Sequence, residues 1–431
     1  MTTFDEIVPI ISDTLREQDA NLQKLGAIVV NRDLNGRVRL IVDKKIRDNG
    51  EAFAALETIA RLLATRLAPH SVSTERMVLV EDDLEIATRG APHFLLPGFT
   101  NVTMVDRLAV DTDWATIAPI ADNAPRIVFY SIKGGVGRST ALAVTAWSLA
   151  QRGKRVLVLD LDLESPGLSS SLLPPDRRPT YGIADWLVED LIDNGATIRR
   201  DMVTMSNLSH DGEIHVVPAH GREPGEYVAK LGRAWMSKIA ADGTRESWPA
   251  RLARLLNDLE ENVRPDVILI DARAGIDEVA SACITNLGVR HILLFALDGE
   301  QTWSGYRILF RHWHQAGVAK DIRERLQLVG AMIPELGGAE YFDQLREHAW
   351  NVFRDELYDE VPAGEPVGER FSFDDNEEGA PHYPWPIKWH RGFAALQSLH
   401  SRFEGVDPDE VTAIFGGLIE GVRMVSENTK S

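Results

Sequence analysis

A short run of glycines followed by two hydroxyl side chains is the part of this sequence best suited to chemistry. Residues 131–140 read SIKGGVGRST, with three glycines shortly before Ser139 and Thr140. Glycines let backbone N–H groups approach a phosphate without interference from Cβ atoms, and a helix that starts here adds its N-terminal amides. A serine hydroxyl so placed can bind Mg²⁺, and the threonine can contact a phosphate. The pattern predicts a site for a nucleotide triphosphate and Mg²⁺, and the candidate binding residues are Gly134, Gly135, Val136, Gly137, Arg138, Ser139 and Thr140.

This loop departs from the strict GxxxxGK[ST] pattern at two positions. Ile132 stands where the first glycine would be, and Arg138 replaces the lysine. Arginine keeps the positive charge, but a planar guanidinium on a longer stem differs from the point charge of lysine. We therefore expect the departures to affect turnover more than nucleotide binding.

Acidic residues end two further apolar runs. Residues 155–162 read RVLVLDLD and residues 267–271 read VILID. Such runs are typical of buried parallel strands whose carboxyl ends face a site. We place Asp160 and Asp271 with Ser139 as candidate metal ligands. Because Asp160 and Asp162 point to opposite faces of a strand, Asp162 can act at the same site only from beyond the strand end.

The elements that must position these residues alternate between strand and helix. The run from residue 126 to 130 leads into the glycine loop, and a helix follows from Ser139 to a stop at Gly153. Further strands are predicted at 155–160, 267–271, 291–297 and 326–333, with a helix at 276–288. This order predicts an α/β fold with a doubly wound, mainly parallel sheet.

Outside this region the chain changes character twice. A block with its own strand and helix alternation comes first and predicts a small α+β domain. A stretch rich in proline, glycine and acid at 361–389 predicts a long irregular loop, and a helix with one apolar face is predicted near the end. The expected domains are residues 1–122, residues 123–400 with the nucleotide site, and a helical segment at 401–431.

Composition excludes several classes of protein. The chain has 65 acidic and 46 basic residues among 431, so its net charge of -19 disfavours nonspecific DNA binding and binding to anionic membranes. A single cysteine, Cys283, cannot form an intramolecular disulfide, and we interpret it as a buried packing thiol rather than a nucleophile paired with His291. An acidic start and the lack of an 18-residue apolar run predict a soluble protein of the reducing cytoplasm.

Taken together, these motifs resemble the deviant Walker A ATPases related to ParA and MinD, whose loop reads KGGxGK[ST]. The resemblance covers about residues 125–400. It is closest to the subset whose loop reads KGGVGR, followed here by DLDLESPG at 160–167 and DARAG at 271–275. The resemblance implies a P-loop fold, ATP and Mg²⁺ as cofactors, an ATP-dependent homodimer and a protein partner.

The same resemblance implies roles for single residues. Lys133 would reach the partner protomer's phosphates, Asp162 would orient the attacking water, and Asp271 would support Mg²⁺. Arg138 holds the position of the cis phosphate-binding lysine, so the candidate catalytic residues are Lys133, Asp162 and Arg138. Arg273 follows Asp271 where the family commonly has proline, and it could contact phosphate, the partner protomer or a nearby acid. No asparagine follows the strand at 326–333, so adenine as the base rests on the resemblance alone.

Three functions stay open at this point. The first is a slowly hydrolysing Mg²⁺-dependent ATPase that acts as a dimerisation switch. The second is a nucleotide-responsive scaffold that barely turns ATP over, similar to the atypical ATPases of pilus-positioning systems. The third is a small-molecule ligase or amidotransferase on the same fold, for which no substrate motif is visible. The biological process, whether partition, polar positioning or phage defence, is left open by the sequence.

Overall fold

The computed structural model describes residues 2–89, 91–110, 112–208, 211–240, 242–362, 366–394 and 399–427. The chain forms two compact units, Met1–Val110 and Asp111–Ser431. Residues 112–122, assigned above to the N-terminal domain, lie in the second unit, where the Ala118 N–H donates to the Thr285 carbonyl at 2.7 Å. The predicted boundary at residue 122 therefore falls inside the second unit.

The first unit is a small α+β domain, as predicted. Its five-stranded sheet has the order β3-β2-β1-β5-β4, with β1 antiparallel to β2 and parallel to β5. Helices α1 and α3 contribute their apolar residues to the core on one face of this sheet. The strands are β1 Ile28–Arg32, β2 Val38–Asp43, β3 Val78–Glu81, β4 His93–Leu95 and β5 Val102–Asp106, and the helices are α1 Ile7–Glu17, α2 Asp19–Leu22, α3 Gly50–Arg66 and α4 Glu85–Thr88.

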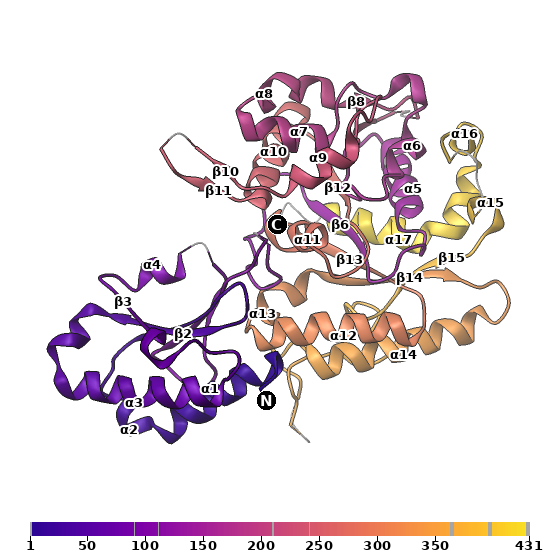
Figure 1. Cartoon of the computed structure of the whole chain (residues 1–431). Coiled ribbons are helices and arrows are strands. Elements are labelled where there is room, and N and C mark those ends of the chain that lie inside the picture. Colours follow the sequence, from indigo (N-terminus) through magenta and orange to yellow (C-terminus); the bar gives the residue numbers. More distant parts are fainter. Residues whose placement is uncertain are drawn as a thin grey trace. The chain divides into compact units, whose positions relative to one another are not determined.

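The second unit is built on an eight-stranded sheet of order β15-β14-β13-β6-β12-β7-β9-β8 (Figure 1). Every neighbouring pair is parallel except β8 with β9. The carboxyl ends of the parallel strands therefore share one edge of the sheet. The strands are β6 Arg126–Ser131, β7 Arg155–Asp160, β8 Thr204–Met205, β9 Glu213–Val217, β12 Val267–Asp271, β13 His291–Ala296, β14 Leu326–Ile333 and β15 Trp385–Lys388.

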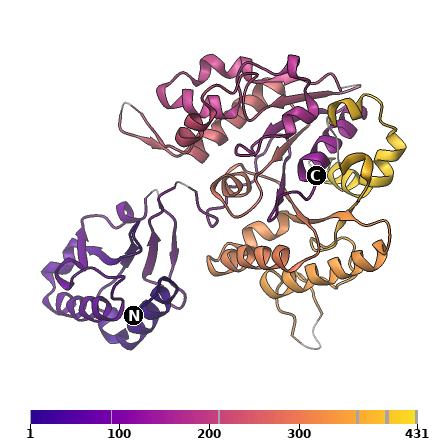
Figure 2. The ribbon, with the colours of Figure 1, turned by 45° about the vertical axis from the view of Figure 1, so that its right-hand side comes forward.

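Helices cover both faces of this sheet, which confirms the doubly wound fold. Alternate residues of β6 enter two different cores: Val128 and Tyr130 join one, and Ile127 and Phe129 join the other. Because both faces are buried, the strands read as unbroken apolar runs. Figure 2 shows the same helices from a second direction. They are α5 Arg138–Gln151, α6 Leu168–Leu172, α7 Ile183–Glu189, α8 Gly195–Ile198, α9 Tyr227–Ala234, α10 Trp248–Val263, α11 Glu278–Ser281, α12 Glu300–Gln315, α13 Ala319–Ile322, α14 Gly338–Glu356, α15 Arg391–Ala394, α16 Leu399–Phe403 and α17 Pro408–Glu427.

Two elements differ from the sequence-based expectation. Strand β15 lies within the stretch predicted as irregular loop, at the edge of the sheet beside β14. The helix predicted at 276–288 consists of the short α11 followed by a π-helical turn, Ala282–Asn286. Cys283 is fully buried in that turn, in agreement with a packing role. No helix among the described residues has both the length and the apolar character needed to cross a bilayer.

Candidate nucleotide-binding site

The glycine loop joins β6 to α5 at the carboxyl edge of the sheet, as the sequence predicts. Gly135 and Gly137 have φ angles of 75° and 78°, which residues with a Cβ rarely adopt. A Cβ placed on Gly134 or Gly135 would meet no atom within 4 Å. The loop therefore presents an open backbone surface directly before the N-terminus of a 14-residue helix.

Ile132 fixes the first corner of this loop by packing. A Cβ built on Gly305 of α12 would lie 2.3 Å from the Ile132 Cγ2 atom, so the isoleucine side chain fills the space that this glycine leaves. The position that would hold the first glycine of the strict motif is thus held by an apolar contact with α12.

A cavity of about 410 Å³ lies against the loop. All seven candidate binding residues from Gly134 to Thr140 line it. Lys133 is exposed and does not line it, and the ammonium group has no hydrogen bond or ion pair with the described residues. The complete lining is Ser131, Gly134, Gly135, Val136, Gly137, Arg138, Ser139, Thr140, Asp162, Ser165, Arg273 and Ala274.

Asp271 lies at the carboxyl end of β12 and is fully buried. One carboxylate oxygen accepts a hydrogen bond from the Ser139 hydroxyl at 2.5 Å, and the other accepts one from Arg138 Nε at 2.6 Å. The hydroxyl and the carboxylate predicted to serve Mg²⁺ are therefore in direct contact.

Asp160 is the neighbour of Asp271 across the sheet, at the end of β7. It is fully buried, and Oδ2 accepts hydrogen bonds from the Ser169 hydroxyl at 2.9 Å and the Ser169 N–H at 3.2 Å. Burial, together with the charge of Asp271, raises the pKa of Asp160 to about 7. Neither Asp160 nor Asp271 is part of the cavity lining, but Asp271 contacts the lining residues Ser139 and Arg138 directly, whereas Asp160 is bonded to Ser169.

Asp162 lies two residues beyond the end of β7, as expected if it acts from outside the strand. Its Oδ2 accepts a hydrogen bond from Arg138 NH2 at 3.0 Å, and its buried Oδ1 has no hydrogen-bond partner among the described residues. Burial raises the pKa of Asp162, while the Arg138 guanidinium opposes that rise. A buried carboxylate oxygen without a donor, beside the cavity, suits a ligand or water that brings a hydrogen.

Arg138 has an orientation that sequence reasoning did not anticipate. The side chain is buried, with 6% of the residue exposed, and the guanidinium donates to Asp271, Asp162 and Ser131. Burial acts to lower the pKa of Arg138, but the two carboxylates raise it, so the group stays charged. The available signal was the group of acids predicted at this sheet edge, because buried carboxylates require a cation or hydrogen-bond donors.

Arg273 and Ser165 complete the cavity from two other loops. Arg273 forms ion pairs with Glu164 at 2.6 Å and with Asp277 at 3.5 Å, and about a third of its side chain is exposed. Of the contacts expected for Arg273, the ion pair with a nearby acid is therefore present, and the side chain also lines the cavity. Ser165 was not singled out from the sequence, although it follows Asp162 by three residues in the same loop.

The residues present fit a Mg²⁺–triphosphate. The open glycine backbone and the helix N-terminus suit phosphate oxygens, and the Ser139–Asp271 pair offers oxygen ligands of the kind Mg²⁺ prefers. No group of three or more His, Cys, Asp or Glu residues able to hold a metal is found in the described part of the chain. Mg²⁺ usually takes only one or two carboxylates and completes its shell with water and phosphate.

Comparison with known proteins gives one family match and several partial relatives. Residues 127–376 match the model of the CobQ/CobB/MinD/ParA nucleotide binding domain. The chain is 37% identical over 73 residues to the septum site-determining protein MinD of Escherichia coli K12, covering 17% of this chain and 27% of that protein. It is 32% identical over 112 residues to nitrogenase iron protein 2 of Methanothermococcus thermolithotrophicus, covering 25% of this chain and 37% of that protein.

Among solved structures, the MinC:MinD cell division protein complex of Aquifex aeolicus aligns with a TM-score of 0.41 and 16% identity. That alignment covers 70% of this chain and 95% of the other. The alignments with the two curated relatives span well under two thirds of either protein's length.

Proposed function

Since the chain belongs to the CobQ/CobB/MinD/ParA nucleotide-binding domain family, we propose that it is a Mg²⁺-dependent ATPase whose nucleotide state controls its dimerisation and its contact with a partner protein. The observation that carries this proposal is the cavity lined by the seven consecutive residues from Gly134 to Thr140, with Ser139 at its wall bonded to the buried Asp271. The recognition of adenine, the existence of a partner protein and the slow rate of hydrolysis are all parts of this proposal.

In this proposal the chain's own groups bind and orient the nucleotide. The backbone from Gly134 to Gly137 and the first amides of α5 bind the phosphates, while Ser139 and Asp271 hold Mg²⁺. Bound Mg²⁺ would neutralise negative charge on the phosphates. Thr140 contacts a phosphate, and Asp162 orients a water through the carboxylate oxygen that has no donor among the described residues.

In this proposal Arg138 has one role in the nucleotide-free protein and another when nucleotide is bound. Without nucleotide it neutralises Asp271 and Asp162 and holds the two loops together. With nucleotide the same cation faces the phosphates from the cavity wall, so part of its attraction for Asp162 is lost. Hydrolysis is slow, because the water-orienting carboxylate competes with phosphate for one guanidinium.

Lys133 serves a second protomer in the proposal. Its exposure, and the lack of a partner for its ammonium among the described residues, support a contact outside its own cavity. A lysine that reaches a triphosphate across an interface gains charge-assisted hydrogen bonds only when that triphosphate is present. Nucleotide occupancy and dimerisation would then be coupled.

Calorimetry with Mg²⁺ and ATP tests the core of this proposal. A ligand present at 100 times its Kd stabilises the folded state by about 2.7 kcal/mol, so binding heat and a thermal shift are both expected. Ser139→Ala should weaken the Mg²⁺-dependent part of the binding, and Ser170→Ala, an exposed serine of α6, is the matched control. A protein that shows neither heat nor a thermal shift at millimolar nucleotide is not a nucleotide-binding protein.

A nucleotide-responsive scaffold is the second candidate, and the Arg138–Asp162 ion pair favours it. If that pair persists with nucleotide bound, the guanidinium stays on Asp162 and does not stabilise charge on the phosphates, so turnover stops. Steady-state phosphate release separates the two functions, because the scaffold would bind ATP and release almost no phosphate.

A further inference from the structure

A ridge of exposed apolar residues runs along α9 and onto the adjacent hairpin. Val228 is 84% exposed, Met236 54% and Ile239 72%, and the exposed Ala229 and Gly232 lie between them in sequence. We call these five residues the α9 ridge. Val228 lies on α9, Met236 just after it and Ile239 on the hairpin, and exposed apolar residues gathered over adjoining elements are a feature of interaction surfaces.

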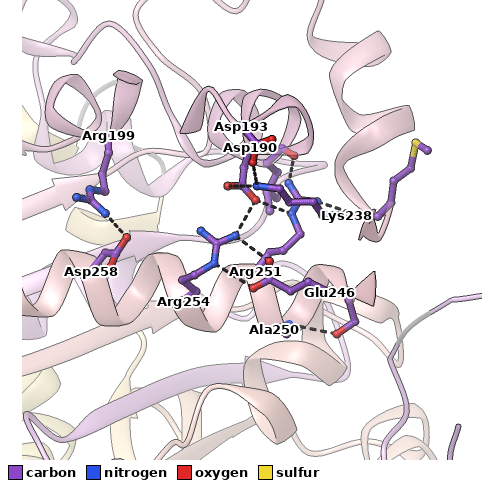
Figure 3. A network of polar contacts seen from close by, with 12 residues as sticks. Asp190, Asp193, Arg199, Lys238, Glu246, Ala250, Arg251, Arg254 and Asp258 are labelled. Carbon is purple, nitrogen blue, oxygen red and sulfur yellow. Dashed lines mark hydrogen bonds and ion pairs between the residues drawn. The ribbon is translucent and has the colours of Figure 1, made fainter. Parts of the chain in front are cut away.

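A polar network holds the hairpin that carries Ile239. The hairpin consists of β10 Lys238–Ile239 and β11 Arg245–Glu246, and it projects from the body of the second unit (Figure 1). Figure 3 shows Asp190 at the centre, accepting hydrogen bonds from Arg251 at 2.8 Å and Arg254 at 2.9 Å. Arg254 also binds Glu246 of β11 at 3.0 Å, and Lys238 of β10 pairs with Asp190 at 3.5 Å. Because an isolated two-stranded hairpin is marginal in water, this network provides a preorganised surface.

The ridge is connected to the nucleotide cavity through its first helical turn. Tyr227, the residue before Val228, donates a hydrogen bond from its hydroxyl to the Leu163 carbonyl at 2.7 Å. Leu163 follows Asp162, which lines the cavity. Burial, and then the charges of Asp160, Asp185 and Asp162, raise the pKa of Tyr227, so the hydroxyl remains a donor. This hydrogen bond ties the start of α9 to the loop that carries Asp162.

We propose that the α9 ridge packs against the same ridge of a second copy of this chain when nucleotide is bound. This inference rests on the proposed function, in which two protomers meet at their nucleotide sites. A stable interface needs about 800 Å² from each partner, or some 20–30 residues a side. The cavity lining supplies only twelve residues, so further contacts are needed, and Tyr227 joins the start of the ridge to the loop that carries Asp162.

The ridge has the features of a self-complementary contact. A Cβ on Gly232 would meet no atom within 4 Å, so this position is a notch beside the protruding Val228. Glu226 and Arg233, both exposed, place opposite charges at the two ends of α9. Antiparallel packing about a two-fold axis sets Glu226 against the partner's Arg233 and Val228 near the partner's Gly232. These features favour a second copy over an unrelated protein.

Cysteine cross-linking tests the contact directly. The single native cysteine, Cys283, is fully buried, so Ala229→Cys, which lies next to the two-fold axis of this packing, introduces a lone accessible thiol on the ridge. Under mild oxidation with Mg²⁺ and a slowly hydrolysed ATP analogue, we expect at least about tenfold more disulfide-linked dimer than with ADP. Ile308→Cys, at a 63% exposed position on α12, is the matched control and should stay monomeric. An Ala229→Cys protein that gives no more dimer than this control would overturn the proposal.

A second variant separates this inference from the proposed function. Val228→Glu should weaken nucleotide-dependent dimerisation, measured by light scattering, by at least about tenfold while leaving nucleotide affinity measured by calorimetry unchanged. Unchanged dimerisation would refute the ridge contact even where ATP binds normally. If the unaltered chain does not bind nucleotide, the proposed function is refuted instead. Dimers that cross-link equally with and without nucleotide would refute the link through Tyr227.

Discussion

Replacement of Arg138 by methionine should destabilise the nucleotide-free second unit strongly. The variant keeps an unbranched stem and removes a guanidinium that donates to Asp271, Asp162 and Ser131. The buried Asp271 and the partly buried Asp162 would then lack the cation that pairs with both. Removing one partner of a buried ion pair costs about 3–5 kcal/mol, because it leaves an uncompensated charge.

Thermal denaturation without nucleotide measures this effect. At about 2 °C per kcal/mol for a domain of this size, the expected decrease in Tm is about 6–10 °C. Mg²⁺ alone should stabilise the Arg138→Met variant more than the unaltered protein, because a bound cation replaces the missing charge between the two acids.

Arg152 provides the matched control at the other end of α5. It pairs with Glu420 at 3.7 Å, and both side chains are nearly half exposed. Exposed pairs contribute about 0–1 kcal/mol, so Arg152→Met should change Tm by no more than about 2 °C. An Arg138→Met protein as stable as the Arg152→Met protein would show that the guanidinium does not hold the site together.

Four further outcomes are expected. Asp162→Asn should retain ATP binding and lower steady-state phosphate release by about 100-fold, and an equal loss of binding would remove its water-orienting role. Lys133→Ala should bind ATP normally but show no ATP-dependent rise in mass by light scattering; a dimer that still forms would exclude the trans contact. Random duplex DNA at physiological salt should not bind with a Kd of about 10⁻⁶ M or tighter, given the net charge of -19, and fluorescence anisotropy checks this. Burial acts to raise the pKa of Asp190, but hydrogen bonds from Arg254 and Arg251 keep it below its ordinary value. Its stabilisation is therefore present above the unfolded-state pKa of about 3.9 and is lost as pH falls through the lower folded pKa. Asp190→Asn should cost about 3–5 kcal/mol at pH 7 in urea denaturation, with the difference shrinking below about pH 4; a difference independent of pH would contradict this.

The parts of the fold that were predictable are those determined by local patterns. Strands β12 and β14 were identified with their observed ends, because strands buried on both faces are unbroken apolar runs. The glycine loop was recognisable for a similar reason, since its φ angles of 75° and 78° at two glycines depend on its own residues. Side-chain alternation indicated that Asp162 would lie beyond the strand end if it acted at the same site as Asp160.

The parts that were not predictable depend on contacts between distant segments. The inward orientation of Arg138 requires Asp271, 133 residues further along the chain, to lie beside it. Strand β15 contains a proline and a tryptophan and forms only because β14 offers a free edge, so its sequence alone indicated a loop. The hairpin of β10 and β11 is likewise held by Asp190, which is far from it in sequence.

The contact between Ile132 and Gly305 has a consequence for any attempt to redesign this loop. The two positions share one volume, since a Cβ at residue 305 would lie 2.3 Å from the Ile132 side chain. Restoring a glycine at position 132 to recreate the strict motif would empty that volume, and enlarging position 305 alone would overfill it. The pair can therefore be exchanged only together, for example as Ile132→Gly with Gly305→Ala. A set of variants that changes the loop but keeps α12 constant would not contain such double substitutions, so their turnover would never be measured.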